Sequence, residues 1–532
     1  MKIRITGFIE GILSLLVSQI LIKIFGVLYS LYLTNKNGFG DTGNAIYMSG
    51  YQIYALLLTI SSIGVPNSIS KLISEKDSIK DYKNANRIFY VAIFIFSIIG
   101  FIGFLILFIF SDIIANNILL IPEAKLSLRI LSPAILFVSV MSVIRGYCNG
   151  ENKIIITAKS QFFEQLLKSI LTIFFVEIVS YNSNNNIELM VASASAATTI
   201  ATFFSLMYII LKYKKTYKRI SGSKSNKKLE NNKRKKMETF PREKIYIIFK
   251  QIVKISLPIT ISAILSSFCK NIDAITVVRI LKKYMSESDA LKKYGIISSK
   301  IDILIAFPLS FNTIISTALI PEISRRKAQN DIIGIVNKIK VSLYLSLCIG
   351  LPATFGMFFY SEEIFLLLFP NAYLGAELLQ LASISLLFSC LSQTITGILQ
   401  GLGKNNIPLF ATFIGIIGKL LCNIVLINIV GIYEKGAIIG NIFLSISMFF
   451  IEFVNLKKYI NIDVNIIKDC SIPITICIAM IIISKKVYFL LLGLLSQSLS
   501  IIGAILVCIF VYIGLNYYFS RFNDMNLNKI LQ

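Results

Sequence analysis

The sequence predicts an all-α integral membrane protein with 14 transmembrane helices, arranged as two parallel-repeat six-helix lobes plus two extra C-terminal helices. The 532 residues are 55% hydrophobic with a mean hydropathy of +0.74, which is more apolar side chain than a globular surface can cover. Apolar windows of spanning length recur along the chain. Motifs from its first half also return in its second half.

The apolar windows are long enough to cross a hydrocarbon core of about 30 Å as helices. The first is too long for the core of a signal peptide and has no A-x-A-like site after it, so we expect an uncleaved first span. The windows are 8–33, 45–65, 88–110, 127–146, 161–180, 188–211, 252–281, 296–320, 339–360, 374–399, 407–430, 434–456, 466–484 and 489–518.

The net charge of +25 comes from basic residues that lie mainly in alternate loops, as the positive-inside rule describes. We therefore expect a multi-pass protein of the cell membrane with both termini in the cytoplasm. The exceptions are lysines in two outside segments: Lys282, Lys283, Lys292, Lys293, Lys485 and Lys486. The eight cysteines form no C-x-x-C and histidine is absent, so we expect neither disulfides nor a metal or other cofactor.

A basic, Asn- and Ser-rich segment divides the chain. We predict an N-terminal lobe over 1–211, a cytoplasmic linker over 212–251, a C-terminal lobe over 252–456, and spans thirteen and fourteen with a cytoplasmic tail over 457–532. The basic linker is expected to lie near anionic lipid headgroups, at about 1 kcal/mol per basic residue. Partner or nucleic-acid binding is the less favoured alternative.

The two lobes share repeated motifs. Gly150, Lys153 and Lys168 return as Gly401, Lys404 and Lys419, each 251 residues later. A further similarity joins the stretch that begins at Val65 to the one that begins at Ile320, 255 residues apart. Parallel repeats of this kind place a substrate site between two lobes near the midplane, and they support alternating access.

Lys23 lies well inside the first span. At about 1.5 Å per residue it is roughly 22 Å from the start of the helix, where a lysine costs about 2.5–3.5 kcal/mol. Such a residue normally faces protein or water. A stripe of small and polar residues accompanies it at near-helical spacing: Gly11, Ser14, Ser18, Gly26 and Ser30.

Lys23 corresponds to Asp273 of span seven, 250 residues later. Lys23 therefore binds substrate or pairs with Asp273 across the lobes, and Lys270 either binds substrate or neutralises Asp273 at i, i+3. Lys300 and Asp302 open span eight. We predict substrate contacts for Lys23, Lys270, Asp273, Lys300 and Asp302, and a hydrated cavity lined by Asn312, Ser316, Ser389, Gln393, Thr396 and Gln400.

Other intramembrane charges have structural interpretations. Glu164 and Lys168 are spaced as an i, i+4 pair, and Lys168 and Lys419 are within snorkelling reach of the cytoplasmic interface.

Two classes of chemistry lack their motifs. The nearest phosphate-binding loop, at 397–405, has the wrong glycine spacing. The acids of the short outside loops do not form the paired carboxylates that a glycosyltransferase needs. We do not expect an enzyme.

Two stretches carry a family resemblance: Val143–Gly150 (VIRGYCNG) and Thr157–Gln165 (TAKSQFFEQ). With Gly64–Leu72 and Leu399–Gly403, they resemble the stage V sporulation protein B and polysaccharide transporter family. That family belongs to the multidrug, oligosaccharidyl-lipid and polysaccharide exporter superfamily and is related to lipid II flippases. We expect structural or gating roles for Arg145, Gly146, Tyr147, Gly150, Gln161, Glu164, Gln400 and Gly401.

The resemblance implies a last helix pair that helps to form a groove for a lipid tail, and basic cavity residues that hold a diphosphate. By position, Lys23 and Lys300 match two of these basic residues. Span two has none, and Ser30 replaces a second arginine of span one.

The resemblance also implies a cargo. We expect a flippase for an undecaprenyl-diphosphate-linked saccharide, above all the peptidoglycan precursor lipid II, in vegetative wall or spore cortex. Expected partners are the lipid-linked saccharide, membrane lipids and cell-wall synthesis proteins. The alternatives are export of another polysaccharide repeat unit, cation-coupled multidrug export and, least favoured, a membrane glycosyltransferase.

Overall fold

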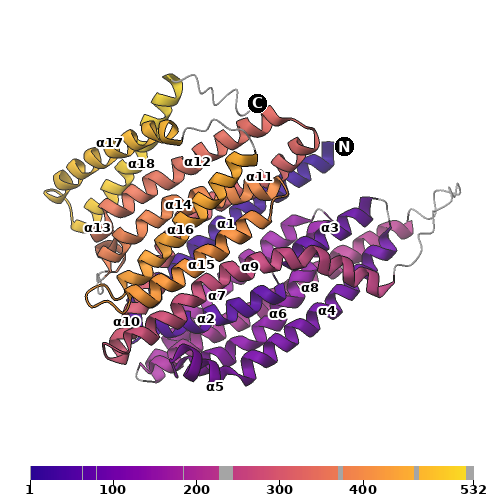
Figure 1. Ribbon diagram of the computed structural model, residues 1–532. Helices are drawn as coiled ribbons and strands as arrows, with labels where there is room; N and C mark the ends of the chain where they lie inside the picture. Colours follow the sequence, from indigo (N-terminus) through magenta and orange to yellow (C-terminus); the bar gives the residue numbers. More distant parts are fainter. Residues whose placement is uncertain are drawn as a thin grey trace. The chain divides into compact units, whose positions relative to one another are not determined.

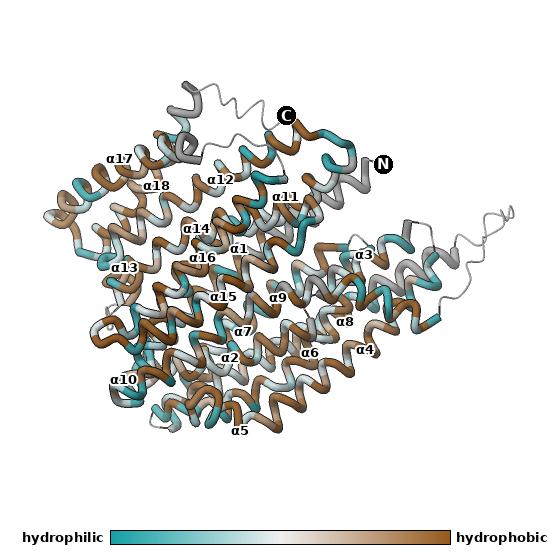
Figure 2. The backbone as a smooth tube through the Cα atoms, in the orientation of Figure 1, coloured by the Kyte–Doolittle hydropathy of each residue, from teal (hydrophilic) through white to brown (hydrophobic). Residues whose placement is uncertain are grey.

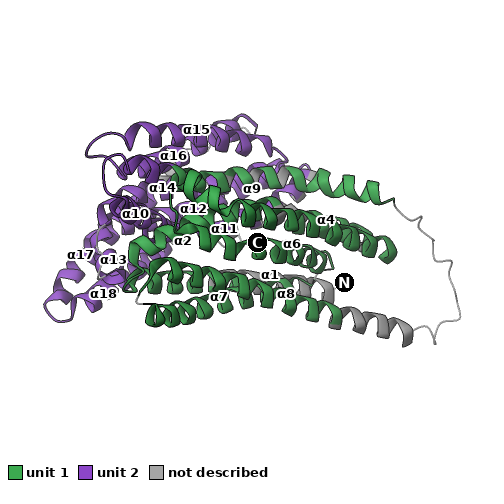
Figure 3. Ribbon diagram, turned by 90° about the horizontal axis from the view of Figure 1, so that it is seen from below, with its two compact units in different colours: residues 1–275 green, residues 276–532 purple. Residues whose placement is uncertain are grey.

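The computed structural model describes residues 2–62, 64–78, 81–151, 153–183, 185–226, 244–369, 375–459 and 466–522. In these residues all regular secondary structure is helical (Figure 1). The basic run Lys233–Lys236 of the predicted linker and the end of the predicted tail lie outside the described residues. The chain separates into two compact units, 1–275 and 276–532, coloured separately in Figure 3.

The first unit contains four pairs of extensively packed helices: α7 with α8, α6 with α8, α4 with α6 and α1 with α7. The helix α9 begins in this unit and ends in the second. The helices that begin here are α1 (Lys2–Asn35), α2 (Gly40–Ser62), α3 (Gly64–Ser78), α4 (Tyr82–Ile109), α5 (Ser111–Ile113), the π-helical turn η1 (Ile114–Leu119), α6 (Ala124–Gly150), α7 (Ile154–Asn182), α8 (Ile187–Asn226) and α9 (Ile245–Leu281).

In the second unit, α14 packs against α11, α12 and α16, and α17 packs against α12 and α18. Its helices are α10 (Glu287–Gly295), the π-helical turn η3 (Ile296–Ile301), α11 (Asp302–Ala328), α12 (Ile332–Phe359), α13 (Ser361–Leu368), α14 (Ala376–Gly401), α15 (Asn406–Leu426), α16 (Lys435–Tyr459), α17 (Ile466–Leu492) and α18 (Gln497–Phe522).

The predicted apolar windows coincide with helices, since each of the fourteen overlaps a long one. Figure 2 shows that apolar residues dominate these helices and that polar residues gather mainly near their ends and in the connections. Among the described residues, ten helices are long and apolar enough to cross a membrane: α4, α6, α8, the continuous segment from α10 through α11, α12, α14, α15, α16, α17 and α18. The chain is therefore an all-helical, multi-pass membrane protein.

Equivalent helices of the two units begin with the same cap. The side chain of Asp81 accepts a hydrogen bond from the Asn84 N–H at 3.2 Å and starts α4. Asp331, 250 residues later, accepts one from the Gly334 N–H at 2.8 Å and starts α12. This backbone hydrogen bond lowers the pKa of the Asp331 carboxyl, because it stabilises the charged form. The internal repeat thus extends to the caps of its helices.

Two glycines allow α6 to approach α3 in the first unit. A Cβ at Gly146 would lie 2.9 Å from Pro66 Cα, and one at Gly150 would lie 2.8 Å from the Ser70 carbonyl oxygen. Both distances are shorter than any ordinary carbon contact. Only glycine therefore fits this helix crossing.

The second unit repeats the crossing between α14 and α11. A Cβ at Gly397 would lie 2.7 Å from the Ser316 carbonyl oxygen, and one at Gly401 would lie 3.0 Å from that of Ile320. These contacts relate α3 to α11 by 250 residues, because Pro66 corresponds to Ser316 and Ser70 to Ile320. The sequence similarity at an offset of 255 residues therefore differs from the packing equivalence, which the helix contacts place at 250 residues.

Four of the six lysines that depart from the predicted positive-inside pattern form ion pairs, among them Lys292, whose Nζ lies 3.9 Å from Asp289. Lys282 Nζ lies 2.5 Å from Glu287, and Lys293 Nζ lies 2.7 Å from Glu434. Lys485 pairs with Glu363. The acid partners neutralise part of the local positive field of these lysines.

A substitution pair tests the glycine crossing. We expect Gly146→Ala to lower the free energy of unfolding by about 1–3 kcal/mol, the usual cost of overpacking. Gly514→Ala is the matched control, because a Cβ there meets nothing within 4 Å. Thermal unfolding of the purified protein in detergent measures both, and an equal effect of the two substitutions would contradict the close-packing explanation.

Candidate functional site

Lys23 of α1 has an exposed side chain in this conformation. Within the described part of the chain it forms no hydrogen bond or ion pair. The alternative in which Lys23 pairs with Asp273 and acts as a structural latch is therefore not realised in this conformation. Ser18 and Ser30 of the same predicted stripe are buried. The stripe therefore divides into serines that pack and a lysine that is open to a ligand.

Lys270 of α9 is exposed as well, and it lies close enough for its charge to act on Lys23. Among the described residues no ion pair joins Lys270 to Asp273, which is buried one turn later with 5% of its surface exposed. Two of the predicted substrate contacts thus form a pair of exposed like charges within the first unit. Such a pair repels itself until an anion binds between the two ammonium groups.

Lys300 has no exposed surface. It lies on the π-helical turn η3, and its Nζ is 5.3 Å from the centroid of the Phe369 ring. Asp302 begins α11 and is partly buried. In this conformation Lys300 therefore offers no surface to a substrate.

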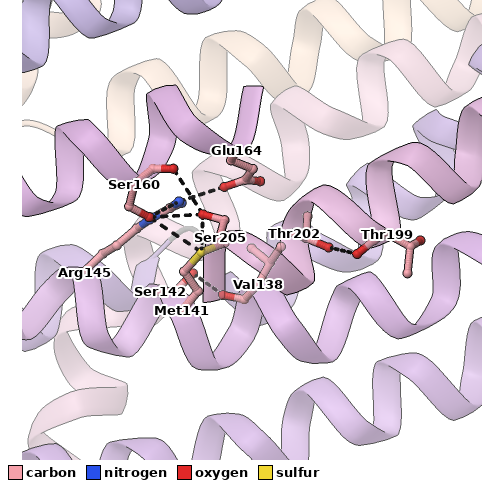
Figure 4. A network of polar contacts seen from close by, with 9 residues as sticks. All are labelled: Val138, Met141, Ser142, Arg145, Ser160, Glu164, Thr199, Thr202 and Ser205. Atoms are coloured by element: carbon pink, nitrogen blue, oxygen red, sulfur yellow. Dashed lines mark hydrogen bonds and ion pairs between the residues drawn. The ribbon is translucent and has the colours of Figure 1, made fainter. Parts of the chain in front are cut away.

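Arg145 connects three helices of the first unit (Figure 4). Its Nη2 donates to Glu164 Oε2 at 2.7 Å and to Ser160 Oγ at 2.9 Å, which ties α6 to α7. The hydroxyl of Ser205 on α8 donates to the Ser160 carbonyl oxygen at 3.1 Å. The structure thus brings together two residues of the resemblance motifs, and Glu164 pairs with Arg145 instead of the expected Lys168.

Tyr147, the neighbour of Arg145 in the motif, closes the end of α6. Its hydroxyl donates to Glu151 at 2.8 Å, and its ring centroid lies 4.7 Å from that of Phe89. Gln161 and Gln400 are partly buried on α7 and α14. Arg145 and Tyr147 thus contact side chains of neighbouring helices, while the expected structural or gating role of the motif residues stays a prediction.

Lys168 and Lys419 are buried, so the expectation that they snorkel to the interface is wrong. Lys168 has 6% of its surface exposed, and its Nζ lies 4.4 Å from the ring centroid of Tyr51 and 5.3 Å from that of Tyr29. Lys419 has 2% exposed. Cation–π attraction offsets part of the desolvation of Lys168, and the spacing of residues along one helix cannot reveal it.

The polar face of α14, which is expected to line a hydrated cavity, makes hydrogen bonds to neighbouring helices. Ser389 shares a hydrogen bond with Ser445 of α16 at 2.9 Å, and Gln393 Nε2 donates to Thr313 of α11 at 2.7 Å. Asn312 and Ser316 are buried and donate to the backbone of α14. These side chains join neighbouring helices because polar groups in an apolar environment need partners.

Glu452 of α16 belongs to the polar contacts between α14 and α16, which we call the α14–α16 seam. It is not among the site residues that the sequence predicts. It accepts hydrogen bonds from Thr396 at 2.7 Å and from Ser392 at 2.9 Å. The signal that would have found it is its isolation, since it is the one acid of the window 434–456 that lies away from the window ends.

An apolar cavity of about 870 Å³ lies within the second unit. Its walls come from α11, α12, α13, α17 and α18, and aromatic and aliphatic side chains dominate them. Phe307, Phe311, Tyr344, Ile349, Met357 and Ile509 are among the lining residues. The final helix pair thus contributes to an apolar cavity of the size that accommodates a lipid chain segment.

Among the described residues, no group of three or more His, Cys, Asp or Glu side chains is arranged to hold a metal. The exposed elements are a lysine pair for an anion in the first unit and an apolar cavity in the second.

Family comparisons agree with this arrangement. The model of the family described as "Polysaccharide biosynthesis protein" matches residues 8–327, and the MatE family model matches residues 258–426. The lipid II flippase MurJ of Bacillus subtilis is 24% identical over 504 residues, covering 91% of this chain and 89% of that protein. Stage V sporulation protein B of the same organism is 22% identical over 416 residues, covering 77% of this chain and 76% of that protein.

Solved structures share the fold. A lipid II flippase MurJ in an inward closed conformation superposes with a TM-score of 0.70 at 16% identity, covering 95% of this chain and 98% of that one. An inward-facing multidrug resistance transporter of the MATE family superposes with a TM-score of 0.66 at 12% identity, covering 83% of this chain and 94% of that one.

The Arg145 ion pair generates a stability prediction. Arg145→Met leaves Glu164 without its cation, so we expect the free energy of unfolding to fall by about 3 kcal/mol. The double substitution Arg145→Met with Glu164→Gln should recover part of this loss, because the uncompensated charge is gone. Thermal unfolding of all three variants measures the coupling, and strictly additive effects would contradict a direct pair.

Proposed function

Because the chain belongs to the polysaccharide biosynthesis protein family, we propose that it is a flippase for an undecaprenyl-diphosphate-linked saccharide. The observation that carries the proposal is the pair of exposed lysines within apolar helices, Lys23 and Lys270. The cargo we favour is lipid II, moved from the inner to the outer leaflet for vegetative wall or spore cortex. The relative named lipid II flippase, which is similar over 91% of this chain, supports this choice.

The lysine pair suits a diphosphate. A diphosphate diester carries two negative charges, and each charge-assisted hydrogen bond is worth about 1.5–3 kcal/mol. Binding also relieves the repulsion between the two ammonium groups. We also propose substrate contacts for Asp273, Lys300 and Asp302. Asp273 and Lys300 are buried in this conformation, so their contacts require a rearrangement, which alternating access supplies.

The apolar cavity suits the polyprenyl tail. A tail that leaves the lipid for this cavity exchanges one apolar environment for another, so packing contacts rather than removal from water would hold it there. The contribution of α18 to the cavity wall supports the proposal of a groove for a lipid tail.

We propose fourteen spans, with both termini and the linker 212–251 in the cytoplasm. The lobes would be 1–211 and 252–456, with 457–532 as the additional helix pair and tail. Transfer of an anionic headgroup outward is favoured by an inside-negative potential, by about 2.3 kcal/mol per charge per 100 mV. Neither a cofactor nor ATP is required, and cell-wall synthesis proteins are proposed as partners.

A cation-coupled multidrug exporter is the second candidate, favoured by the MatE family match at residues 258–426. Two exposed lysines disfavour a cationic drug. Export of another saccharide repeat unit would use the same binding chemistry as our proposal. A glycosyltransferase would differ, because it would convert the lipid-linked saccharide into a new product.

A leaflet assay tests the proposal. Purified protein in liposomes with labelled lipid II and an imposed potential should move the label between leaflets without changing it chemically. We expect Lys23→Ala to slow flipping about tenfold or more, and Lys23→Arg to retain much of the rate. Wild-type flipping rates in Lys23→Ala would contradict the proposal that Lys23 binds the diphosphate and acts as its anchor.

A charge exchange separates the anchor from a latch. Lys23→Asp combined with Asp273→Lys preserves a pair between the two positions. We expect this variant to remain inactive, because an acid replaces the diphosphate anchor. Restored flipping would support the latch instead.

The cavity generates a separate prediction. Gly356 lines it, and a Cβ there meets nothing within 4 Å, so Gly356→Phe should fill the cavity without a clash. We expect slower flipping of a long-chain substrate, with less effect on a short-chain analogue, because only the long chain would need the space that the ring occupies. Gly514→Phe, at an equally open position, is the control. Equal loss for both chain lengths would contradict the assignment.

A further inference from the structure

Glu452 is a completely buried acid in an apolar helix, and the proposed function does not use it. Its side chain has no exposed surface. Within the described part of the chain its two hydrogen bonds come from the hydroxyls of Thr396 and Ser392, at 2.7 and 2.9 Å. Each carboxyl oxygen thus has one neutral donor and no cation.

This environment favours the neutral acid. An ionised carboxylate buried without a cation costs several kcal/mol, whereas a protonated one needs only ordinary hydrogen bonds. A hydroxyl both donates and accepts, so Ser392 or Thr396 can serve either form of the carboxyl. The site can hold a proton without rearrangement of its first neighbours.

The internal repeat shows that Glu452 lacks an arginine such as the one that pairs with Glu164 in the first unit. Thr396 lies 251 residues after Arg145, so a hydroxyl occupies the repeat position of the guanidinium. In the first unit, the guanidinium of Arg145 pairs with the carboxylate of Glu164 at 2.7 Å. In the second unit, the same helix position offers only a hydroxyl to an acid. The two units therefore differ in charge at related places.

No neighbouring charge substitutes for that arginine. The helices α14 and α15 pack against α16. Glu377 pairs with Lys435 at 2.7 Å, and Lys457 Nζ lies 4.9 Å from the ring centroid of Phe453. The titratable side chains of the three helices, Glu452 apart, are Glu377, Cys390, Lys419, Cys422, Lys435, Lys457, Lys458 and Tyr459, and none of them is hydrogen-bonded to Glu452.

We propose that Glu452 is a proton-binding site, occupied at neutral pH in this conformation and emptied when the α14–α16 seam opens to water. The reaction is the formation and breaking of one O–H bond, with the proton taken from and returned to water. Combined with the flippase activity proposed above, on which this step rests, proton release and rebinding accompany each transport cycle.

The protonation state is tested without any transport. Infrared difference spectra of the full-length protein in lipid nanodiscs, recorded across a pH titration, should contain at pH 7 the carbonyl band of a protonated carboxylic acid. Glu452→Gln should remove that band, and Glu377→Gln, at an exposed acid, should leave it. A wild-type spectrum that matches Glu452→Gln at pH 7 would show an ionised Glu452 and overturn the proposal.

A second variant tests the proposal even if Glu452→Gln fails to fold. Thr396→Val keeps the acid and removes one donor that stabilises the carboxylate. The band should then persist to higher pH than in the wild type. A band that disappears at the same pH in both proteins contradicts the assignment to Glu452.

The link to transport is tested in liposomes with labelled lipid II and an imposed pH gradient at fixed potential. The wild-type rate should change with the gradient, and the rate of Glu452→Gln should not. An equal response of both proteins overturns the coupling. Absence of flipping in every protein overturns the proposed function instead, while the infrared titration still decides whether Glu452 holds a proton.

Discussion

The cost of a charge in a low-dielectric bilayer governs how this protein is built. Each charged side chain in its apolar helices has a defined environment. Arg145 pairs with Glu164 at 2.7 Å, and Lys168 is buried beside the rings of Tyr29 and Tyr51. Lys23 and Lys270 are the contrasting case, because they are exposed and repel each other. The proposed anion site depends on these two charges, which no acid of the described residues neutralises through an ion pair.

The repeat preserves packing more strictly than polarity. Gly146 and Gly150 of α6 recur as Gly397 and Gly401 of α14. In each unit the neighbouring helix lies so close to these glycines that a Cβ would overlap with it. Around this shared crossing the polar groups have diverged. An ion pair connects helices in the first unit, and a buried acid with two hydroxyl donors does so in the second. A common scaffold can thus support different electrostatic tasks.

The two units supply complementary binding chemistry. The first offers paired cations, and the second offers an apolar cavity of about 870 Å³ with walls from its last helices. A lipid-linked saccharide diphosphate has the corresponding halves, an anionic headgroup and a long hydrocarbon chain. This correspondence, together with membership of the polysaccharide biosynthesis protein family, is why we favour a flippase over a drug exporter.

The sequence by itself determined the helical membrane fold, the repeat and the exceptional position of Lys23, because spanning length, hydropathy and the cost of burial depend on local composition. Tertiary structure decided which polar groups meet. Glu164 was expected to pair with Lys168, yet Arg145 from another helix takes that place. Likewise, Lys300 and Lys419 are buried, and the polar face of α14 bonds to α11 and α16. Helical periodicity gives the face on which a side chain lies, whereas its partner depends on which helices pack there.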